Sequence, residues 1–363
     1  MAENVRVLDP LYESYCLPLN GLLEHRYVLR AKGVGLSAIP PQWVRGEYFD
    51  NKCDPSQFEH SCGVTRLALG ISARNQIQTL EFVVAAFLHD ISQPAFSHIG
   101  EQRMPGYNPY QRAAQMVLEE SLAALVTKAG ANPVTVAAII RGEGPYGPLL
   151  SGPLDIDHID STLRYAMRYG IFQKHVYHAL EIAKAFMRTG ARWVLDASIV
   201  PQLERWRFVL ARNCQVAYGK RFLGRAAVLQ RALDAYQAEK GDLIHLLSAT
   251  DWAAAERLRQ TASSAKYVKV LDENQPTYHL GDVAAPRLDN RTLCQRAAAQ
   301  VGLPPDLVVA DGPRNGRTET MSLPLSNGET FTASAVVPPA VRVYAIEPPP
   351  KKPDPQAWCA PSP

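Results

Sequence analysis

Two histidines and two aspartates have the residue types of a metal site: His60, His89, Asp90 and Asp157. His89 and Asp90 directly follow an almost wholly apolar segment, Leu80 to Leu88. A buried carboxylate there is costly unless a metal ion or an Arg or Lys side chain meets it. Two neutral imidazoles and two carboxylates suit a divalent transition metal, Mn, Fe, Co, Ni or Zn, because these ions accept mixed nitrogen and oxygen ligands. Water and a substrate phosphate would fill the open positions, and the metal would lower the pKa of the water and polarise the phosphoryl oxygen.

Helix ends must bring these four side chains together. The apolar periodicity predicts three helices that carry them, over residues 59–74, 80–90 and 154–169. On the last of these helices Asp157 and Asp160 are three residues apart and share a face, whereas Asp155 does not fall on it. Helical hairpins of this kind place such ends side by side.

The chain divides into three parts by its periodicity. Residues 1–264 predict a helical domain with an extended segment at its start, and they include one long helical pattern over 199–239. Residues 265–347 predict a small α+β lobe. Residues 348–363 are proline-rich and predict a disordered tail.

Strand patterns gather in the predicted lobe. Residues 266–271 and 277–280 predict one hairpin. Residues 318–323 and 329–335 predict another, because Ser326-Asn327-Gly328 between them is a strong hairpin turn signal.

Composition limits the class of protein. The chain has 363 residues, of which 47% are hydrophobic, and a formal net charge of only +3. This balance argues against a dedicated nucleic-acid surface, although a local basic groove would still be compatible with it. The N-terminus lacks the pattern of a signal peptide, and no apolar run approaches the roughly 20 residues that span a bilayer. Scattered cysteines without a CxxC pair indicate reduced thiols. We therefore expect a soluble, cytoplasmic protein with no membrane partner.

Two other motifs fail on their context. Cys53, His60 and Cys62 resemble part of a zinc set, but no second pair completes four ligands. The segment Gly33 to Ala38 fits a dinucleotide-binding glycine pattern, which needs a strand before it and a helix after it. A helical pattern precedes this segment and Pro40-Pro41 follows it, so neither requirement is met.

Several motifs together resemble the HD-domain superfamily of metal-dependent phosphohydrolases. The likeness is greatest to the deoxynucleotide triphosphohydrolase branch, which includes the bacterial dGTPase-like enzymes, and it covers roughly residues 5–265. The matching pieces are Asp9-Pro10, Phe58-Glu59-His60-Ser61-x-Gly63-Val64, Leu88-His89-Asp90-Ile91, Pro94-Ala95-Phe96-Ser97-His98, and Asp155-Ile156-Asp157-His158-Ile159-Asp160 with Arg164.

The resemblance implies a mainly α fold, with an HD-domain helical core and a small α+β C-terminal lobe, and a homo-oligomer. It implies that His60, His89, Asp90 and Asp157 bind the metal. Asp90 would also serve catalysis, His98 would face the phosphate, and Glu101 would stand where the family has an acid that orients a catalytic histidine. The expected substrate contacts are Gln93, Tyr110, His158, Ser161 and Arg164.

The chain departs from this family around the substrate. Gln93 takes the last position of the family's HDxxH pattern, and Tyr110-Gln111 stands in place of its next His-Glu pair. Gln57 replaces an arginine, His158 a lysine, and Ser161 a tyrosine that helps to hold the sugar. Loss of cationic and donor groups weakens the binding of a triphosphate. Either the substrate carries fewer phosphates, or other groups hold them, or catalysis has been lost.

Other groups could bind the phosphates or protonate the leaving oxygen. His98, His158, Arg164, Lys220 or the arginines of residues 205–231 could hold phosphates, although charges on such a helix usually form a solvated face or subunit contacts. His98, Glu101 or Tyr110 could protonate the leaving oxygen. His98 is the preferred acid because the pKa of an unperturbed histidine is about 6.5.

These observations predict a metal-dependent phosphohydrolase that acts on a phosphate ester of a nucleotide, either a (deoxy)nucleoside triphosphate or a nucleoside monophosphate. The alternative is a catalytically degenerate protein on the same scaffold, which would bind a nucleotide or a partner chain in a regulatory role.

Overall fold

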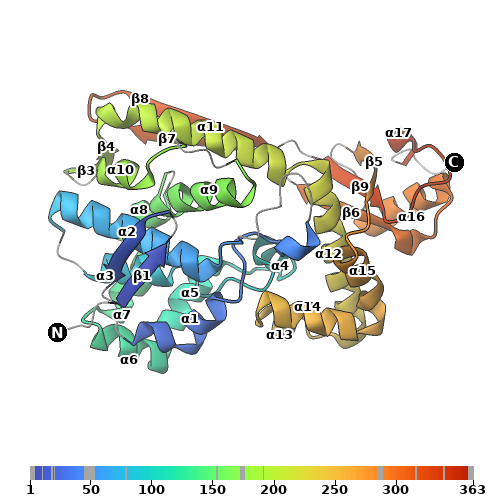
Figure 1. The fold of residues 1–363 in the computed structure, drawn as a ribbon, viewed down its shortest axis with the longest axis horizontal. Helices are drawn as coiled ribbons and strands as arrows, with labels where there is room; N and C mark the ends of the chain where they lie inside the picture. The colour runs from blue at the N-terminus through green and yellow to red at the C-terminus, as the bar shows by residue number, and fades with distance from the viewer. Residues whose placement is uncertain are drawn as a thin grey trace.

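The computed structural model describes residues 5–9, 11–17, 19, 21–44, 54–77, 80–152, 154–171, 176–190, 192–283, 289–314, 317–337 and 340–358. Helices dominate this part of the chain, and the strands form small antiparallel sheets (Figure 1). The prediction of a mainly α fold with a small α+β portion is confirmed.

Three helices carry the candidate ligands. Helix α2 (Gln57–Asn75) begins with a capping box between Ser56 and Glu59, and helix α3 (Leu80–Leu88) buries every residue from Phe82 onward. Helix α9 (Ile156–Arg168) begins after Asp155, whose carboxylate accepts the backbone N–H of His158 at 2.8 Å. Asp155 is therefore the N-cap of this helix, which explains why it does not share the face of the other two aspartates. Helix α2 packs against both α3 and α9.

Further helices lie elsewhere in the described chain. They are α1 (Arg26–Ala31), α4 (Ser97–Gln102), α5 (Pro109–Val117), α6 (Glu120–Lys128), α7 (Pro133–Ile140), α8 (Gly147–Leu150), α10 (Ala179–Lys184), α13 (Leu243–Leu247), α14 (Asp251–Gln260) and α16 (Asn290–Val301). Two short hairpins accompany them: β1 (Val5–Asp9) with β2 (Glu13–Leu17), and β3 (Phe186–Thr189) with β4 (Arg192–Leu195).

Two details of the helical prediction are wrong. The long pattern over 199–239 is two helices, α11 (Val200–Ala217) and α12 (Lys220–Lys240), separated at Tyr218–Gly219. Residues 266–271 are not a strand but lie within α15 (Ala262–Asp272), which packs on α12. The valines in this segment imitate a strand, but its buried positions include Ser264, Tyr267, Val268 and Leu271, which follow helical spacing.

The C-terminal strands go to two different places. Strands β5 (Tyr278–Val283), β9 (Ala340–Ala345) and β6 (Val308–Arg314) form an antiparallel sheet in the order β5-β9-β6. Strands β7 (Arg317–Pro324) and β8 (Thr330–Val337) form the predicted hairpin, which lies along α11 instead of joining that sheet (Figure 1). The hairpin's turn meets β4, where Ser326 N–H donates to the Leu195 carbonyl at 2.8 Å.

The predicted disorder of the tail is wrong for residues 348–358. Helix α17 (Pro355–Trp358) ends in a tryptophan that is only 1% exposed. Its Nε1–H donates to Gln300 Oε1 at 2.6 Å, and α17 packs against β5 and α16. Burial of this ring, its hydrogen bond and the packing against β5 and α16 together hold this segment in place. Residues 359–363 lie outside the described residues.

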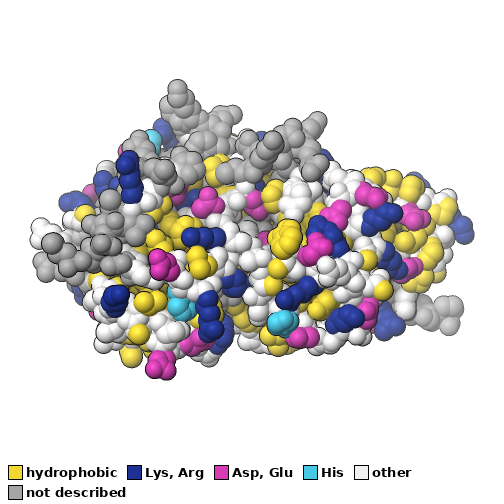
Figure 2. Space-filling model, turned by 60° about the horizontal axis from the view of Figure 1, so that its bottom comes forward, with side chains coloured by type: hydrophobic (Ala, Val, Ile, Leu, Met, Phe, Trp, Pro, Cys, Tyr) yellow, Lys and Arg dark blue, Asp and Glu magenta, His cyan; other side chains and the backbone are white. Residues whose placement is uncertain are grey.

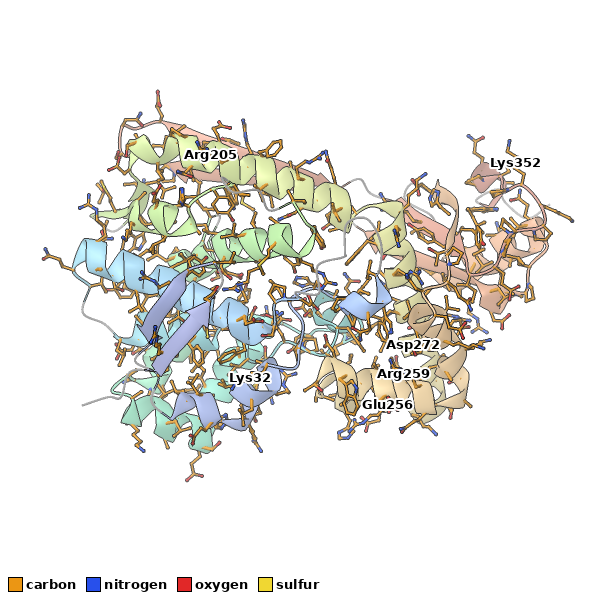
Figure 3. All side chains as sticks on the ribbon, in the orientation of Figure 1. Lys32, Arg205, Glu256, Arg259, Asp272 and Lys352 are labelled. Carbon is orange, nitrogen blue, oxygen red and sulfur yellow. The ribbon has the colours of Figure 1, made fainter. Side chains whose placement is uncertain are left out.

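Charges of both signs are interspersed on the face of the molecule shown in Figure 2. In Figure 3, Arg259 lies between α14 and α15, where it pairs with Glu256 and Asp272. No single helix among the described residues is long and apolar enough to cross a membrane, and α6 with α7 reaches that length only as a pair bent by 106°.

Candidate metal centre and active site

The structure brings the four predicted metal ligands together. His60 lies in the first turn of α2, His89 and Asp90 follow α3 directly, and Asp157 lies in the first turn of α9. His60 Nε2 is 3.0 Å from Asp157 Oδ1 and 3.7 Å from Asp90 Oδ2. His89 Nε2 is 3.5 Å from Asp90 Oδ2 and 4.0 Å from Asp157 Oδ2. One donor atom from each of His60, His89 and Asp157 lies within 4.8 Å of the others, a spacing that a single ion can bridge.

The hydrogen bonds of the two imidazoles suit a metal. His89 Nδ1 lies 2.9 Å from the Ala86 carbonyl, which can only accept, so this nitrogen carries the proton. His89 Nε2 therefore presents a lone pair, and it is buried without a hydrogen-bond partner. A buried lone pair facing two carboxylates is destabilising unless a cation lies among them. The donor set of two imidazoles and two carboxylates, each imidazole fixed through its other nitrogen, fits a divalent metal.

A buried polar network fixes His60. Its Nδ1 lies 2.7 Å from Asp160 Oδ2, and Asp160 also accepts from Arg164 Nε at 2.6 Å and from the Tyr12 hydroxyl at 2.7 Å. Arg164 in turn donates to Asp9 at 2.6 Å. The expectation that Arg164 contacts the substrate is wrong, because its guanidinium is fully buried between these two carboxylates.

The electrostatics of the cluster favour a positive charge at its centre. Burial lowers the pKa of His60, but hydrogen bonds and charges from Asp157 and Asp160 outweigh burial and raise it. Burial raises the pKa of Asp157, but the hydrogen bond and charge of His60 outweigh burial, and the net pKa lies below its usual range. The Tyr110 hydroxyl donates to Asp157 Oδ2 at 3.2 Å, and the charge of Asp157 raises the pKa of Tyr110 well above its usual value. Tyr110 is thus a poor acid at this position.

A cavity of about 580 Å³ opens over the cluster. The predicted site residues that line it are His60, Asp90, Gln93, His98, Glu101, Tyr110, Asp157, His158 and Ser161. Gln93 Nε2 lies 3.4 Å from Asp90 Oδ1, and His158 Nδ1 lies 2.8 Å from the capping carboxylate of Asp155. All the predicted substrate contacts except Arg164 therefore face this cavity.

His98 and Glu101 form a pair in its wall. His98 Nδ1 is 3.1 Å from Glu101 Oε2, and the His98 side chain is 61% exposed toward the cavity. Desolvation lowers the pKa of His98, but the hydrogen bond and charge of Glu101 more than offset it, and the net direction is upward. A histidine whose pKa a carboxylate raises can, in its protonated form, donate a proton from its other nitrogen.

The turn before this pair is strained. Phe96 and Ser97 have φ of 62° and 43°, a left-handed conformation that is costly for residues with a Cβ. Asp251 at the start of α14 holds the turn, because its carboxylate accepts from Phe96 N–H at 2.8 Å and Gly35 N–H at 3.0 Å. Ser97 Oγ also donates to the Gly35 carbonyl at 2.6 Å. Sequence reasoning did not identify Asp251, because its partners are distant in the chain and no local motif marks it.

Aromatic residues at the far end of the cavity were also missed. Tyr165 and Tyr169 stack with ring centroids 5.8 Å apart, and Phe222 meets Tyr169 edge to face at 6.3 Å. Tyr218 lines the same end. Tyr165 and Tyr169 are four residues apart, a helical spacing that was visible in the sequence, but aromatic residues at this spacing more often belong to a hydrophobic core.

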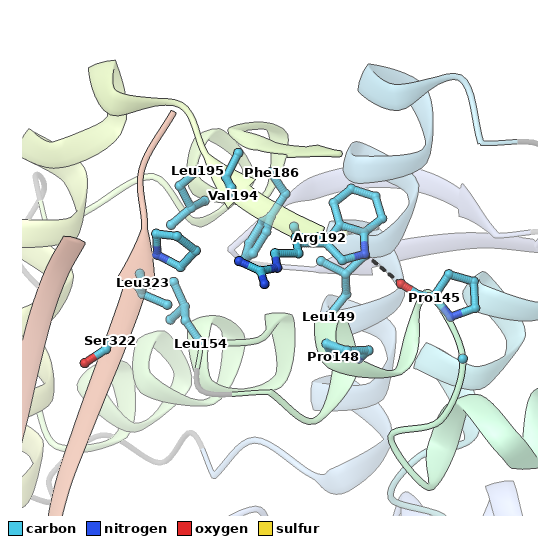
Figure 4. A pocket seen from close by; sticks show the side chains of 13 residues that line it. Pro145, Pro148, Leu149, Leu154, Phe186, Arg192, Val194, Leu195, Ser322 and Leu323 are labelled. Atoms are coloured by element: carbon cyan, nitrogen blue, oxygen red, sulfur yellow. Dashed lines mark hydrogen bonds between the residues drawn. The ribbon is translucent and has the colours of Figure 1, made fainter. Parts of the chain in front are cut away.

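A second cavity, of about 300 Å³, lies between β4, the β7 strand and the loop before α8 (Figure 4). Its described lining is mainly apolar, with Arg192 as its charged member, and Trp193 Nε1–H donates to the Pro145 carbonyl at 2.6 Å. Because no His, Asp, Glu or Cys is among these lining residues, this cavity offers neither metal ligands nor groups for proton transfer.

Comparisons with known proteins agree with this geometry. Residues 58–145 match the family model described as HD domain, and this segment contains His60, His89 and Asp90. The chain is similar in fold to a phosphohydrolase from Bacteroides thetaiotaomicron, with 14% identity and a TM-score of 0.66 over 95% of this chain and 100% of that one. It is also similar to a hypothetical protein from Aquifex aeolicus, with 15% identity and a TM-score of 0.69 over 94% and 96% of the two chains. No curated protein matches the sequence.

Proposed function

We propose that the protein is a metal-dependent phosphohydrolase that cleaves a phosphate ester of a nucleotide, and the match of residues 58–145 to the HD-domain family model supports this class. The observation that carries this proposal is the unpartnered, buried Nε2 of His89, which faces Asp90 and Asp157. A lone pair and two carboxylates gathered in this way call for a divalent cation. The protein of similar fold from Bacteroides thetaiotaomicron, a phosphohydrolase, supports the same class of reaction.

The chain's own residues divide the work of hydrolysis. His60, His89, Asp90 and Asp157 would hold the metal, which when bound supplies an activated water and polarises the phosphoryl oxygen. Asp160 fixes the ring of His60 by accepting its Nδ1–H.

His98 is placed to protonate the oxygen that leaves phosphorus. Glu101 orients its ring through Nδ1 and favours the protonated form. The Tyr110 hydroxyl already donates a hydrogen bond to Asp157, and its raised pKa makes it a weaker acid.

Metal content and phosphate release measured on the full chain test this proposal. The protein is stripped with a chelator, reloaded in turn with Mn, Fe, Co, Ni or Zn, and assayed on nucleoside mono-, di- and triphosphates. Asp157→Ala is expected to lose metal and turnover, whereas Glu347→Ala, which changes an exposed carboxylate elsewhere, retains both. Wild-type protein that binds neither metal nor substrate would overturn the proposal. Binding of a nucleotide and metal without turnover would instead favour the regulatory alternative.

A further inference from the structure

We infer that the substrate is a phosphate monoester whose alcohol carries a planar, uncharged ring, and not a nucleoside triphosphate. This inference rests on the proposed function of the same site and names its substrate class. It follows from the charges around the cavity and from the shape of the end remote from the metal ligands.

The described residues that line the cavity include no lysine or arginine. They do include the carboxylates of Asp90, Glu101 and Asp157. Asp90 and Asp157 already match the two positive charges of a divalent metal, and His98 matches Glu101. A phosphate monoester carries about −1.5 to −2 charges at neutral pH, and each further phosphoryl group adds at least one more. Among the described lining residues, no positive charge is therefore left for a polyphosphate chain, which proteins usually bind with Arg and Lys.

Five described arginines on the elements around the cavity already have partners. Arg30 donates to the carbonyls of Ile91 and Gln93 at 2.8 and 2.6 Å. Arg103 pairs with Asp234 at 3.0 Å. Three more are engaged in the same way: Arg164 with Asp9 and Asp160, Arg168 with Asp54 and the Ile39 carbonyl, and Arg225 with Asn274 and the Val270 carbonyl.

On α11, three arginines considered from the sequence either lie outside the cavity or already have a partner. Arg205 on α11 is exposed and does not line the cavity (Figure 3). Arg207 pairs with Glu204, and Arg212 donates to Gln215 at 3.0 Å. Recruiting any of the paired arginines for phosphate would break an existing contact and leave its partner unpaired.

The far end of the cavity suits a ring. Tyr165, Tyr169, Tyr218 and Phe222 line it, together with Leu210 and small apolar side chains. Tyr165 is half-buried, and its ring, which stacks on the buried Tyr169, can contact a further planar group. The Tyr165 hydroxyl is occupied by the Leu36 carbonyl at 3.0 Å, so it is the ring that remains for the ligand. A cavity of about 580 Å³ has room for a phosphate and one such group.

The reaction that this arrangement predicts is balanced. The oxygen of water bonds to phosphorus, and the bond from phosphorus to the ester oxygen breaks. His98 gives its proton to the departing oxygen and recovers one from the attacking water. The products are the ring-bearing alcohol and inorganic phosphate.

Two matched series test the inference on the Mn-loaded full chain. The first compares AMP, ADP and ATP at constant free metal, by kcat/KM and by calorimetric Kd. Both measures should favour AMP by roughly tenfold or more over ADP, and by more again over ATP. The second compares naphthyl phosphate with glycerol phosphate, and the ring should lower KM. Triphosphate turned over as well as the monophosphate, or no effect of the ring, would overturn the inference while leaving a working phosphohydrolase. No turnover of any compound would instead overturn the proposed function.

A steric variant locates the ring. Ala217 is half-buried at the end of α11 and lines the apolar end of the cavity. Ala217→Trp should raise KM and Kd for AMP and naphthyl phosphate by roughly tenfold or more while leaving glycerol phosphate unchanged. Ala217→Ser, which adds little volume, is the matched control. Equal losses on all three compounds would show a general defect and would contradict the assignment.

Discussion

His60 and Asp160 meet at 2.7 Å in a fully buried pair, one helix donating the Nδ1 proton and another receiving it. This hydrogen bond leaves Nε2 of His60 directed at Asp157. We expect Asp160→Asn, which keeps the shape but removes the charge, to weaken metal binding by about 10–100-fold. Calorimetric titration of the stripped protein with Mn measures the change.

The conservative substitution separates orientation from folding. Asp160 also pairs with Arg164, so Asp160→Ala would leave a buried cation without one partner and unfold more readily. If Asp160→Asn binds Mn as tightly as the wild type, the role assigned to this carboxylate is wrong.

Gly63 must remain a glycine for a steric reason. A Cβ at this position would collide with Asp160 Oδ1 and Arg164 Nη2. We expect Gly63→Ala to lower the free energy of unfolding by about 1–3 kcal/mol and to weaken metal binding as well. Gly70→Ala on the same helix is the control, because its Cβ would meet flexible side chains, Leu180 Cδ1 at 2.7 Å and Lys184 Cγ at 3.7 Å. Denaturant unfolding compares the two; equal effects would argue against the collision.

The pairing of His98 with Glu101 predicts how activity depends on pH. His98 must be protonated to donate, so activity should fall as pH rises through its pKa, which Glu101 raises. Glu101→Gln removes that charge and should move the alkaline limb of kcat to lower pH. His98→Asn should reduce kcat by roughly 10²–10⁴-fold on esters with poor leaving groups.

Leaving-group dependence is the check on this assignment. p-Nitrophenyl phosphate needs little protonation of its leaving oxygen, so it should be hydrolysed by His98→Asn with a much smaller loss. A loss that is the same for good and poor leaving groups would assign His98 to binding instead.

Asp251 predicts a pH dependence of stability. Burial raises its pKa from 3.8 to about 7, against the lowering effect of the Phe96 and Gly35 N–H groups, and the nearby Asp54 adds to the rise. The folded protein therefore keeps a proton that the unfolded chain has released above about pH 4. The stability from this group is complete below that pH and is lost as pH rises toward 7, by up to about 4 kcal/mol.

Urea unfolding between pH 4.5 and 8 measures this slope. Asp251→Asn cannot titrate and should flatten it, although the variant is less stable overall because one of two N–H groups loses its acceptor. Parallel slopes for the two proteins would assign the pH dependence to other groups.

The candidate ligands could be found from the sequence because local rules place them. His60, His89 and Asp157 lie at helix ends that apolar periodicity marks, and each helix forms where it was predicted. The fold class followed from the same periodicity. Homo-oligomer formation and the division of the chain at residue 264 stay predictions.

Long-range contacts account for what the sequence could not show. The pairing of Arg164 with Asp9 spans 155 positions, and that of Asp251 with Phe96 spans 155 as well. No local pattern distinguishes a buried structural arginine from one that binds phosphate. Helix α15 was mistaken for a strand because its β-branched residues fit either period, and packing against α12 decided the outcome.

The β7–β8 hairpin has a consequence for how the protein folds during its synthesis. Met321, Leu323 and Phe331 on this hairpin belong to the same apolar cluster as the helices that carry the candidate metal ligands. A ribosome makes the chain from its N-terminus, so those helices emerge long before the hairpin that shares their apolar cluster. The cluster is therefore complete only after translation has passed Phe331.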